Sequence, residues 1–295
     1  MASRTLNFTD HRRALHTNRY VYAVVSRRSR GLSIGINLNP DKACNFACPY
    51  CQVDRTVPGG ERRIDTALLG VELAEILSHV QDGTLWDRAP FDTTAPAMRV
   101  VRDVAIAGDG EPTACPQFSE SIDVIAAVCR NAGLRFDGDR EIRFNLLTNA
   151  TLFHRSKVRL GLERFSAAGG EIWAKLDAGT QDYFELVDGT RLSLDRVVAN
   201  ITESARTRPL LIQSLFMRWD NVDPTDAECD AWAGRLAGIL DAGGQIRMVQ
   251  VYTLARRPAD ARASIVPTAV LERIADRARN LGLCVQLSPG VSQED

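Results

Sequence analysis

Residues whose types and spacing could do chemistry are concentrated in one segment, DKACNFACPYCQVDR, at residues 41–55. It contains three of the seven cysteines of the chain, Cys44, Cys48 and Cys51. Thiolates are soft ligands that suit zinc, copper(I) or an iron–sulfur cluster. A structural zinc site is closed by four ligands, and this segment supplies only three cysteines. The spacing therefore favours a [4Fe–4S] cluster with one iron open to a small molecule, and a zinc site is the alternative.

The remaining cysteines and histidines are poorly placed to complete a zinc site. No histidine lies between residues 17 and 78, and the next cysteine along the chain is Cys115. We expect Cys129 and Cys284 to be small apolar core residues. The clustered thiols of a reducing compartment indicate metal binding or catalysis rather than a disulfide framework.

The elements that must position these residues alternate between strands and helices. Apolar runs bounded by turn residues predict strands at 32–38, 101–108, 141–150, 171–179, 210–219, 246–254 and 283–288. Helical spacing predicts helices at 66–80, 118–133, 156–170, 193–205, 225–244 and 268–282. The predicted buried face of helix 118–133 carries Phe118, Ile122, Ile125 and Cys129. Thr225 and Glu228 have the spacing of a capping box at the start of helix 225–244.

Six strand–helix units in series predict an α/β fold with a parallel sheet and the helices outside it. Six units are too few for an eight-fold barrel, so we expect a partial, curved (β/α)6 barrel of the TIM type with one open side. Active sites of such sheets lie at the C-terminal ends of the strands. Polar residues do follow the predicted strands, in the cysteine segment and at 108–112, 148–149, 175–177, 218–219 and 253–257.

Together these motifs resemble the radical S-adenosylmethionine (SAM) superfamily. The spacing Cys-x3-Cys-x2-Cys, with Tyr50 before the third cysteine, is similar to its cluster-binding loop, and AGDGEPT resembles its glycine-rich motif. LLTNAT resembles a strand end that lies beside SAM. AKLDAGT, VQVYTLARRP and SRRSRGLSIGINLNPDKACNFACPYCQ are similar to a branch of short members related to the wyosine-synthase-like group. The resemblance covers roughly residues 20–285.

This resemblance implies that Cys44, Cys48 and Cys51 hold a [4Fe–4S] cluster whose open iron binds the amino and carboxylate groups of SAM. In that superfamily an electron from the cluster cleaves SAM to a 5′-deoxyadenosyl radical, which abstracts hydrogen from a substrate. The implied SAM-binding residues are Tyr50, Gly108, Asp109, Gly110, Glu111, Pro112, Thr148 and Asn149. From the residues alone, Tyr50 could equally pack in the core and 148–149 could equally end a strand. Segment 108–112 taken alone would indicate a plain turn, and the cysteine loop favours the functional role.

Lys175 and Asp177 are the candidate catalytic residues, with Cys115 as a third. Because they are two apart in a predicted strand, Lys175 and Asp177 point to the same face. Burying either unpaired is costly, so we expect a ligand, or each other, to satisfy them. Lysine is scarce here, with three among 36 basic side chains. Cys115 is the one remaining thiol that we expect near the site.

Composition is that of a soluble globular enzyme, with 45% hydrophobic and 25% charged residues and a net charge of −1. No apolar run is long enough to span a membrane, and the N-terminus lacks a signal-peptide core. We therefore expect a cytoplasmic protein with no membrane partner. Residues 1–30 carry seven arginines and one acid, and are expected to form a basic arm or an edge strand. Residues 31–288 would form the partial barrel and 289–295 a tail.

The sequence thus predicts a radical SAM enzyme with oxidoreductase-like chemistry, reduced by a donor such as flavodoxin or ferredoxin. RNA or a nucleotide is favoured as substrate by the basic N-terminus and the branch resemblance. Modification of a peptide, or activation of a partner protein, is the alternative, although no second cysteine cluster is present. Arg218, Arg256 and Arg257 either bind an anionic substrate or are solvated. A non-enzyme alternative is an iron–sulfur electron carrier or a zinc-stabilised binding module.

Overall fold

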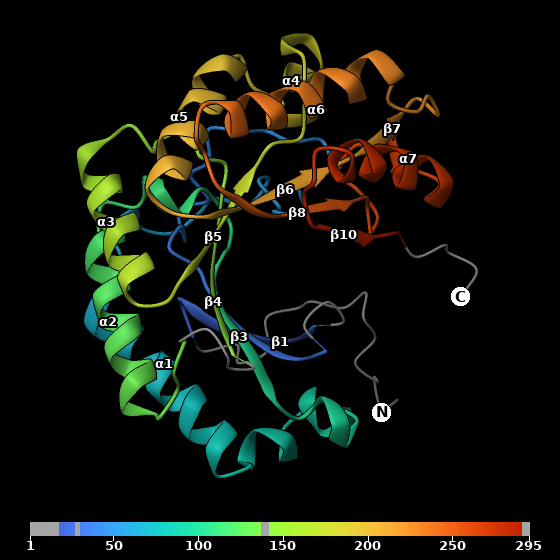
Figure 1. Ribbon diagram of the computed structural model, residues 1–295. Coiled ribbons are helices and arrows are strands. Elements are labelled where there is room, and N and C mark those ends of the chain that lie inside the picture. The colour runs from blue at the N-terminus through green and yellow to red at the C-terminus, as the bar shows by residue number, and fades with distance from the viewer. Residues whose placement is uncertain (1–17, 27–29, 137–141, 291–295) are drawn as a thin grey trace. The chain divides into compact units, whose positions relative to one another are not determined.

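The computed structural model describes residues 18–26, 30–136 and 142–290 (Figure 1). The chain divides into two compact units. Unit 1 comprises residues 1–43, 55–147 and 155–172, and unit 2 comprises residues 44–54, 148–154 and 173–295. Each unit pairs parallel strands with helices, as the alternating sequence pattern predicts.

Unit 1 is built on four strands in the order β1 (Val21–Ser26), β2 (Gly31–Ile36), β3 (Val101–Ile106) and β4 (Arg143–Thr148). Strand β1 is antiparallel to β2, and the other neighbours are parallel. Three helices belong to this unit, α1 (Thr66–Gln81), α2 (Phe118–Asn131) and α3 (Ser156–Ala167). Four short 3-10 helices lie at Thr84–Asp87, Phe91–Thr93, Pro96–Met98 and Pro112–Ala114. Most of the predicted basic arm, residues 1–17, lies outside the described residues.

Strand β2 and the inner faces of the helices form the core of unit 1. Every residue of β2 is buried, as expected for a strand covered on both faces. The face predicted for helix α2 is confirmed, because Phe118, Ile122, Ile125 and Cys129 are all buried. Helices α1 and α2 pack together, and α2 packs on α3.

Unit 2 contains four parallel strands in the order β5 (Glu171–Lys175), β6 (Leu210–Leu215), β8 (Ile246–Tyr252) and β10 (Val285–Ser288). The first two residues of β5, Glu171 and Ile172, are counted in unit 1. Its helices are α4 (Gln181–Asp188), α5 (Leu194–Thr207), α6 (Asp226–Asp241) and α7 (Thr268–Arg279). The capping box predicted for α6 is present, since the Thr225 side chain accepts a hydrogen bond from the Glu228 N–H at 3.2 Å.

Three features of unit 2 differ from the sequence prediction. The strand expected over 210–219 is two strands, because after Leu215 the chain changes partners and β7 (Met217–Trp219) pairs antiparallel with β9 (Ala263–Ile265). Helix α4 was not predicted, because eight residues are too few for a clear periodic signal. The expectation that Cys284 lies in the core is wrong. Its side chain is exposed, because it precedes β10 at the edge of the sheet.

Within the described ranges, no helix has both the length and the apolar character needed to cross a membrane.

Candidate active site

The cysteine loop, residues 44–54, belongs to unit 2. Cys44, Cys48 and Cys51 are all partly exposed. The Cys51 N–H donates to the Cys48 carbonyl at 2.9 Å, and the Phe46 N–H donates to the Cys44 sulfur at 3.5 Å. Among the described residues, no three His, Cys, Asp or Glu side chains are gathered as ligands for one metal ion. The donor set of three thiols on one loop fits an iron–sulfur cluster, in which each thiolate binds a different iron.

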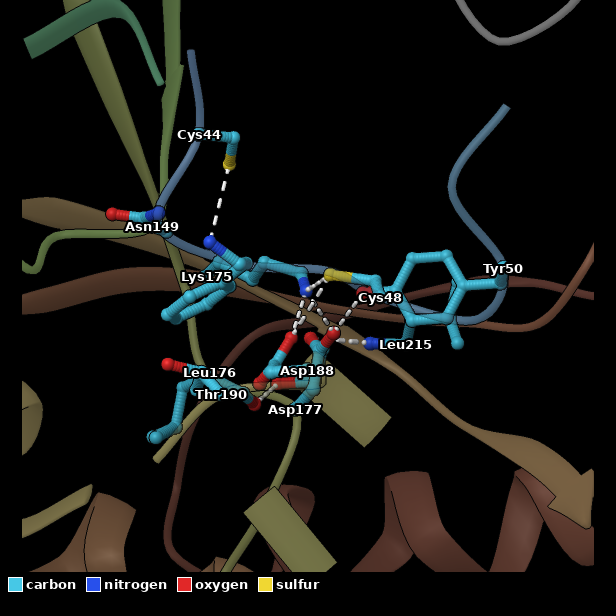
Figure 2. Close-up of polar contacts among 12 residues, drawn as sticks. Cys44, Cys48, Tyr50, Asn149, Lys175, Leu176, Asp177, Asp188, Thr190 and Leu215 are labelled. Carbon is cyan, nitrogen blue, oxygen red and sulfur yellow. Dashed lines mark hydrogen bonds and ion pairs between the residues drawn. The ribbon is translucent and has the colours of Figure 1, made fainter. Parts of the chain in front are cut away.

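One ammonium group lies at the centre of this loop's contacts (Figure 2). Lys175 is the last residue of β5, and its Nζ lies 2.8 Å from Asp177 Oδ2 and 3.4 Å from the Cys48 sulfur. The same Nζ pairs with Asp188 Oδ1, and Asp188 Oδ1 also accepts from the Cys48 thiol at 3.5 Å. Of the two expected partners, a ligand or each other, the structure shows Lys175 and Asp177 paired with each other, with Asp177 lying beyond the end of β5.

Both carboxylates of this cluster are buried, Asp177 at 0% and Asp188 at 1% exposure. Burial raises the pKa of Asp188, although the Lys175 charge opposes that rise. Burial alone would lower the pKa of Lys175, but the charges of Asp177 and Asp188 raise it well above its ordinary value. Burial also raises the pKa of the Cys48 thiol to about 12. The group is therefore a buried ion-pair network in which the lysine stays charged.

Tyr50 is tied into the same network. Its hydroxyl donates to Asp177 Oδ2 at 2.5 Å, and the centre of its ring lies 4.8 Å from Lys175 Nζ. Burial raises its pKa well above the ordinary value. The other carboxylate oxygen of Asp177 accepts from the Leu215 N–H at 2.9 Å, at the end of β6. Tyr50 thus packs on Lys175 in this structure, and the adenine contact implied by the resemblance stays a prediction.

Strand-end amides hold the start of the loop. Asn149 Nδ2 donates to Asn45 Oδ1 at 2.7 Å, and Asn45 Nδ2 donates to Thr151 Oγ1 at 2.6 Å. Thr151 Oγ1 donates in turn to Asn149 Oδ1 at 2.7 Å, which closes a triangle of side chains. Thr148 Oγ1 accepts from the Ala150 N–H at 3.1 Å. In this structure Thr148 shapes the turn and Asn149 anchors the cysteine loop.

The C-terminal end of α4 packs directly under the loop. The Ala47 N–H donates to the Asp188 carbonyl at 3.0 Å. Gly189 ends the helix with φ of 58°, in the left-handed region that favours glycine. A side chain at Gly189 would overlap the backbone of Ala47. The close approach of α4 to the loop therefore depends on this glycine.

The end of the loop is held by the segment after β8. The Pro49 carbonyl accepts from the Asp260 N–H at 2.9 Å. Arg256 donates to Gln52 Oε1 at 2.9 Å, and Gln52 donates to the Arg257 carbonyl at 3.1 Å. Arg256 and Arg257 are thus neighbours of the cysteine loop. Arg218 is instead paired with Asp223, with Nε and Oδ1 2.9 Å apart.

The glycine-rich segment 108–112 belongs to unit 1 and follows β3. The Asp109 N–H donates to Asn37 Oδ1 at 3.1 Å, and Asn37 Nδ2 donates to Asp109 Oδ2 at 2.9 Å. A side chain at Gly108 would overlap Asn37, and one at Gly110 would overlap the backbone of Ala43. The two glycines therefore let this segment lie against residues 37–43.

The Glu111 backbone extends this packing toward the cysteine loop. Its N–H donates to the Ala43 carbonyl at 3.0 Å, and Ala43 directly precedes Cys44 in the chain. The buried Glu111 side chain accepts from Thr113 Oγ1 at 2.5 Å and from the Thr113 N–H at 3.1 Å. It caps the short helix that begins at Pro112. Glu111 is therefore engaged with its own turn in this structure.

Cys115 is buried, and its thiol lies 3.9 Å from Gln117 Oε1. Burial raises its pKa to about 11. A thiol in such surroundings is inert rather than nucleophilic. Its proposed catalytic role has no support in these contacts.

Sequence reasoning missed three residues of this site, Asn45, Asp188 and Gly189. Asn45 lies inside the quoted cysteine segment, but nothing in sequence connects it with residues 149 and 151. Asp188 and Gly189 lie in the sequence VDG. Its glycine indicates the end of a helix, but nothing in the pattern indicates a contact with Lys175 or the cysteine loop.

Comparisons with known proteins find a likeness in fold to a solved enzyme. No family model matches it. A solved radical SAM methyltransferase from Sphaerobacter thermophilus has a TM-score of 0.59 and 13% identity, covering 94% of this chain and 71% of that one. This likeness shows the fold, so the α/β fold predicted from the sequence is confirmed.

Two curated relatives match part of the chain in sequence. GTPase Obg from Brachyspira hyodysenteriae is 26% identical over 204 residues, which is 68% of this chain and 25% of that protein. A UPF0026 protein from Helicobacter pylori is 26% identical over 169 residues, 57% of this chain and 46% of the relative. This chain therefore spans less than half the length of either relative.

Proposed function

We propose that this chain is a radical SAM enzyme in which Cys44, Cys48 and Cys51 hold a [4Fe–4S] cluster. The observation that supports this most directly is the cysteine loop itself. Three thiols lie on one loop that is fastened to the C-terminal end of β5 through Lys175, in a fold similar to that of a radical SAM methyltransferase. Such strand ends are where active sites of this fold class lie. When bound, the cluster would supply the electron that cleaves SAM to a 5′-deoxyadenosyl radical.

The chain's own residues would bind and orient the cosubstrate. The backbone of 108–112 is the candidate site for the SAM ammonium group, because glycines at 108 and 110 permit close approach of a ligand to the backbone. Glu111 is the carboxylate of that segment. Tyr50, Thr148 and Asn149 are the further candidates, and Asn149 also anchors the loop through Asn45. Lys175 and Asp177 are proposed to act beside the cluster.

Anaerobic reconstitution with iron and sulfide tests this function. The wild-type protein should bind about four irons per chain, the stoichiometry of a [4Fe–4S] cluster. Added SAM should change the electron paramagnetic resonance (EPR) signal of the reduced cluster, and dithionite should then yield 5′-deoxyadenosine. Cys48→Ala should lose the iron, whereas Cys284→Ala, which changes an exposed thiol outside the loop, should keep it.

The same experiment separates the competing classes of function. A cluster that forms but neither responds to SAM nor cleaves it would indicate an electron carrier. Zinc bound in place of iron by freshly purified protein, with no cluster after reconstitution, would indicate a binding module. Either result would overturn the proposed enzyme.

RNA or a nucleotide is the proposed substrate class, and the support is the seven arginines in residues 1–30. Phosphate contacts release counterions, so an RNA complex should weaken steeply as salt rises. Fluorescence anisotropy with a labelled RNA at two salt concentrations measures this. Binding to a peptide with no salt-sensitive RNA binding would favour the alternative, radical modification of a peptide or activation of a partner protein. A cytoplasmic location and reduction by flavodoxin or ferredoxin belong to the same proposal.

A further inference from the structure

The ammonium group of Lys175 contacts three alternate residues of the cysteine loop. Its Nζ lies 5.2 Å from the centre of the Phe46 ring, 3.4 Å from the Cys48 sulfur and 4.8 Å from the centre of the Tyr50 ring. The Lys175 side chain is 16% exposed. Cations over aromatic faces are attracted by the ring electrons, and more strongly when they are shielded from water. One side chain therefore organises residues 46, 48 and 50 at once.

Two buried carboxylates fix the position of this ammonium group. Asp177 Oδ2 lies 2.8 Å from Nζ, and Asp188 pairs with the same atom. Asp177 is anchored to the Leu215 N–H and Asp188 to the end of α4. Neither carboxylate can move far without leaving a buried charge unpaired, which is costly. Asp177 and Asp188 thus hold the Lys175 ammonium group in place. Its third N–H donor is directed at the Cys48 sulfur of the cysteine loop.

The Cys48 sulfur receives a hydrogen bond from a charged side chain, the Lys175 ammonium group. Hydrogen bonds to the sulfurs of iron–sulfur clusters are among the factors that set their reduction potential. A compact ammonium group suits this crowded position between two rings, whereas a guanidinium group is planar and larger. The choice of lysine is notable in a chain where three of 36 basic residues are lysine.

We propose that Lys175 is the positioning residue of the cluster: its N–H···S contact fixes the Cys48 sulfur and raises the reduction potential of the cluster bound there. This inference rests on the proposed function. It assigns Lys175 to the cluster rather than to the substrate, and Asp177 and Asp188 to holding Lys175. Phe46 and Tyr50 then serve as the aromatic walls that keep the ammonium group beside the sulfur.

The test compares Lys175→Met with the charge-balanced pair Lys175→Met/Asp188→Asn, because the single change leaves two buried carboxylates without their cation. Lys157→Met, at an exposed lysine of α3, is the matched control. The first readout uses the cluster-free protein, where cysteine alkylation is mapped by mass spectrometry. Divided by the thiolate fraction, which the pH dependence of alkylation supplies, the Cys48 rate should be about tenfold faster in the charge-balanced pair, the factor that corresponds to losing about 1.4 kcal/mol of restraint. The control should match the wild type.

The second readout is the reduction potential of the reconstituted cluster, followed by EPR in a redox titration. The charge-balanced pair should have a lower potential than the wild type and an altered EPR line shape, with thermal unfolding close to that of the wild type. Lys175→Arg should fail to restore the wild-type line shape. A merely structural lysine would change the unfolding temperature and leave the potential unchanged.

The outcomes separate this inference from the proposed function. If the wild type binds four irons and the charge-balanced pair has the same potential and the same Cys48 alkylation, Lys175 does not position the cluster and the inference is wrong. If the wild type binds no iron, the proposed function is wrong whatever Lys175 does. If the alkylation changes but the potential does not, the part of the inference that concerns the potential is overturned.

Discussion

Asn149, just after β4, and Asn45, in the cysteine loop, are joined amide to amide, with Asn149 Nδ2 donating to Asn45 Oδ1 at 2.7 Å. Thr151 completes the triangle with both of them. The Thr190 hydroxyl donates to the Asn45 carbonyl at 3.2 Å. The residue that follows Cys44 is thereby bonded to two segments far from it in sequence. These contacts fix where the cysteine loop begins.

Replacing Asn149 by alanine should loosen this start of the loop and weaken cluster retention. Residues that orient metal ligands typically affect metal affinity by about 10-fold or more. Iron release to a chelator, followed by absorbance, should therefore be about tenfold faster in Asn149→Ala. Asn131→Ala, on the exposed end of α2, is the control and should match the wild type.

The pairing itself is tested by a double-mutant cycle. Because Asn45 and Asn149 share one hydrogen bond, the effects of Asn45→Ala and Asn149→Ala should not add. Strictly additive effects on iron release would show that the two amides act independently, contrary to the contact seen here.

Gly189 should tolerate no side chain. Its φ of 58° costs an L-residue about 1 kcal/mol, and a Cβ there would overlap the Ala47 backbone. Gly189→Ala should thus lower the free energy of unfolding by more than about 1 kcal/mol, measured by urea denaturation, and should also speed iron release. Gly234→Ala in α6 is the matched control. Nothing lies within 4 Å of its added Cβ, so helix propensity should make it up to about 1 kcal/mol more stable. Equal behaviour of the two variants would refute the close contact at Ala47.

Stability should fall at alkaline pH because of the buried thiol of Cys129. Burial raises its pKa from 9.0 to about 12, so the folded protein keeps a proton that the unfolded chain releases above about pH 9. The stability that the protonated Cys129 thiol contributes is fully present below pH 9 and is lost as the pH rises from there toward 12. The free energy of unfolding should fall between pH 8 and pH 10 in both proteins. The fall should be about 1 kcal/mol smaller in Cys129→Ala than in the wild type.

The pH dependence, rather than the absolute stability, is the quantity to compare, since Cys129→Ala also removes core volume. Chemical denaturation at each pH supplies it. Cys284→Ala, at an exposed thiol, should keep the wild-type pH dependence. An identical fall with pH in Cys129→Ala would mean that other groups cause it.

The features predictable from sequence were those set by local periodicity. The spacing of two between Lys175 and Asp177 predicts that both side chains point the same way, and the structure puts Nζ and Oδ2 2.8 Å apart, although β5 ends at Lys175. The helical period predicted the buried face of α2, and the Thr225 capping box marked the start of α6. Each of these signals lies within a few residues of its effect.

The unpredicted features depend on contacts between distant segments. Asp188 meets Lys175 and Cys48 only because the short helix α4 ends beneath the loop. Asn45 and Asn149 are 104 residues apart, and no local pattern connects them. Cys284 is expected in the core as a small apolar residue, but β10 is an edge strand, and an edge leaves side chains uncovered. In all three cases the surroundings of the side chain depend on tertiary packing, which no local pattern encodes.

Gly110 offers a test of SAM binding that leaves the cysteines unchanged. A Cβ at Gly110 would overlap the Ala43 carbonyl, to which the Glu111 N–H donates at 3.0 Å. Gly110→Ala must therefore displace segment 108–112 from residues 37–43. If this segment receives the SAM ammonium group, the Kd for SAM should rise at least about tenfold, equivalent to about 1.4 kcal/mol. The change in the EPR signal of the reduced cluster on SAM titration measures this Kd.

Gly60→Ala is the control for this substitution, since its Cβ would make only ordinary contacts, at 3.6 Å or more, with Pro40. It should bind SAM like the wild type. Iron content should be the same in both variants and the wild type, because Gly110 touches none of the three cysteine side chains in the contacts described. Unchanged SAM affinity in Gly110→Ala would remove segment 108–112 from the SAM site. Loss of iron together with SAM binding would instead show that the packing at Ala43 supports the cluster loop, because Cys44 follows Ala43 directly in the chain.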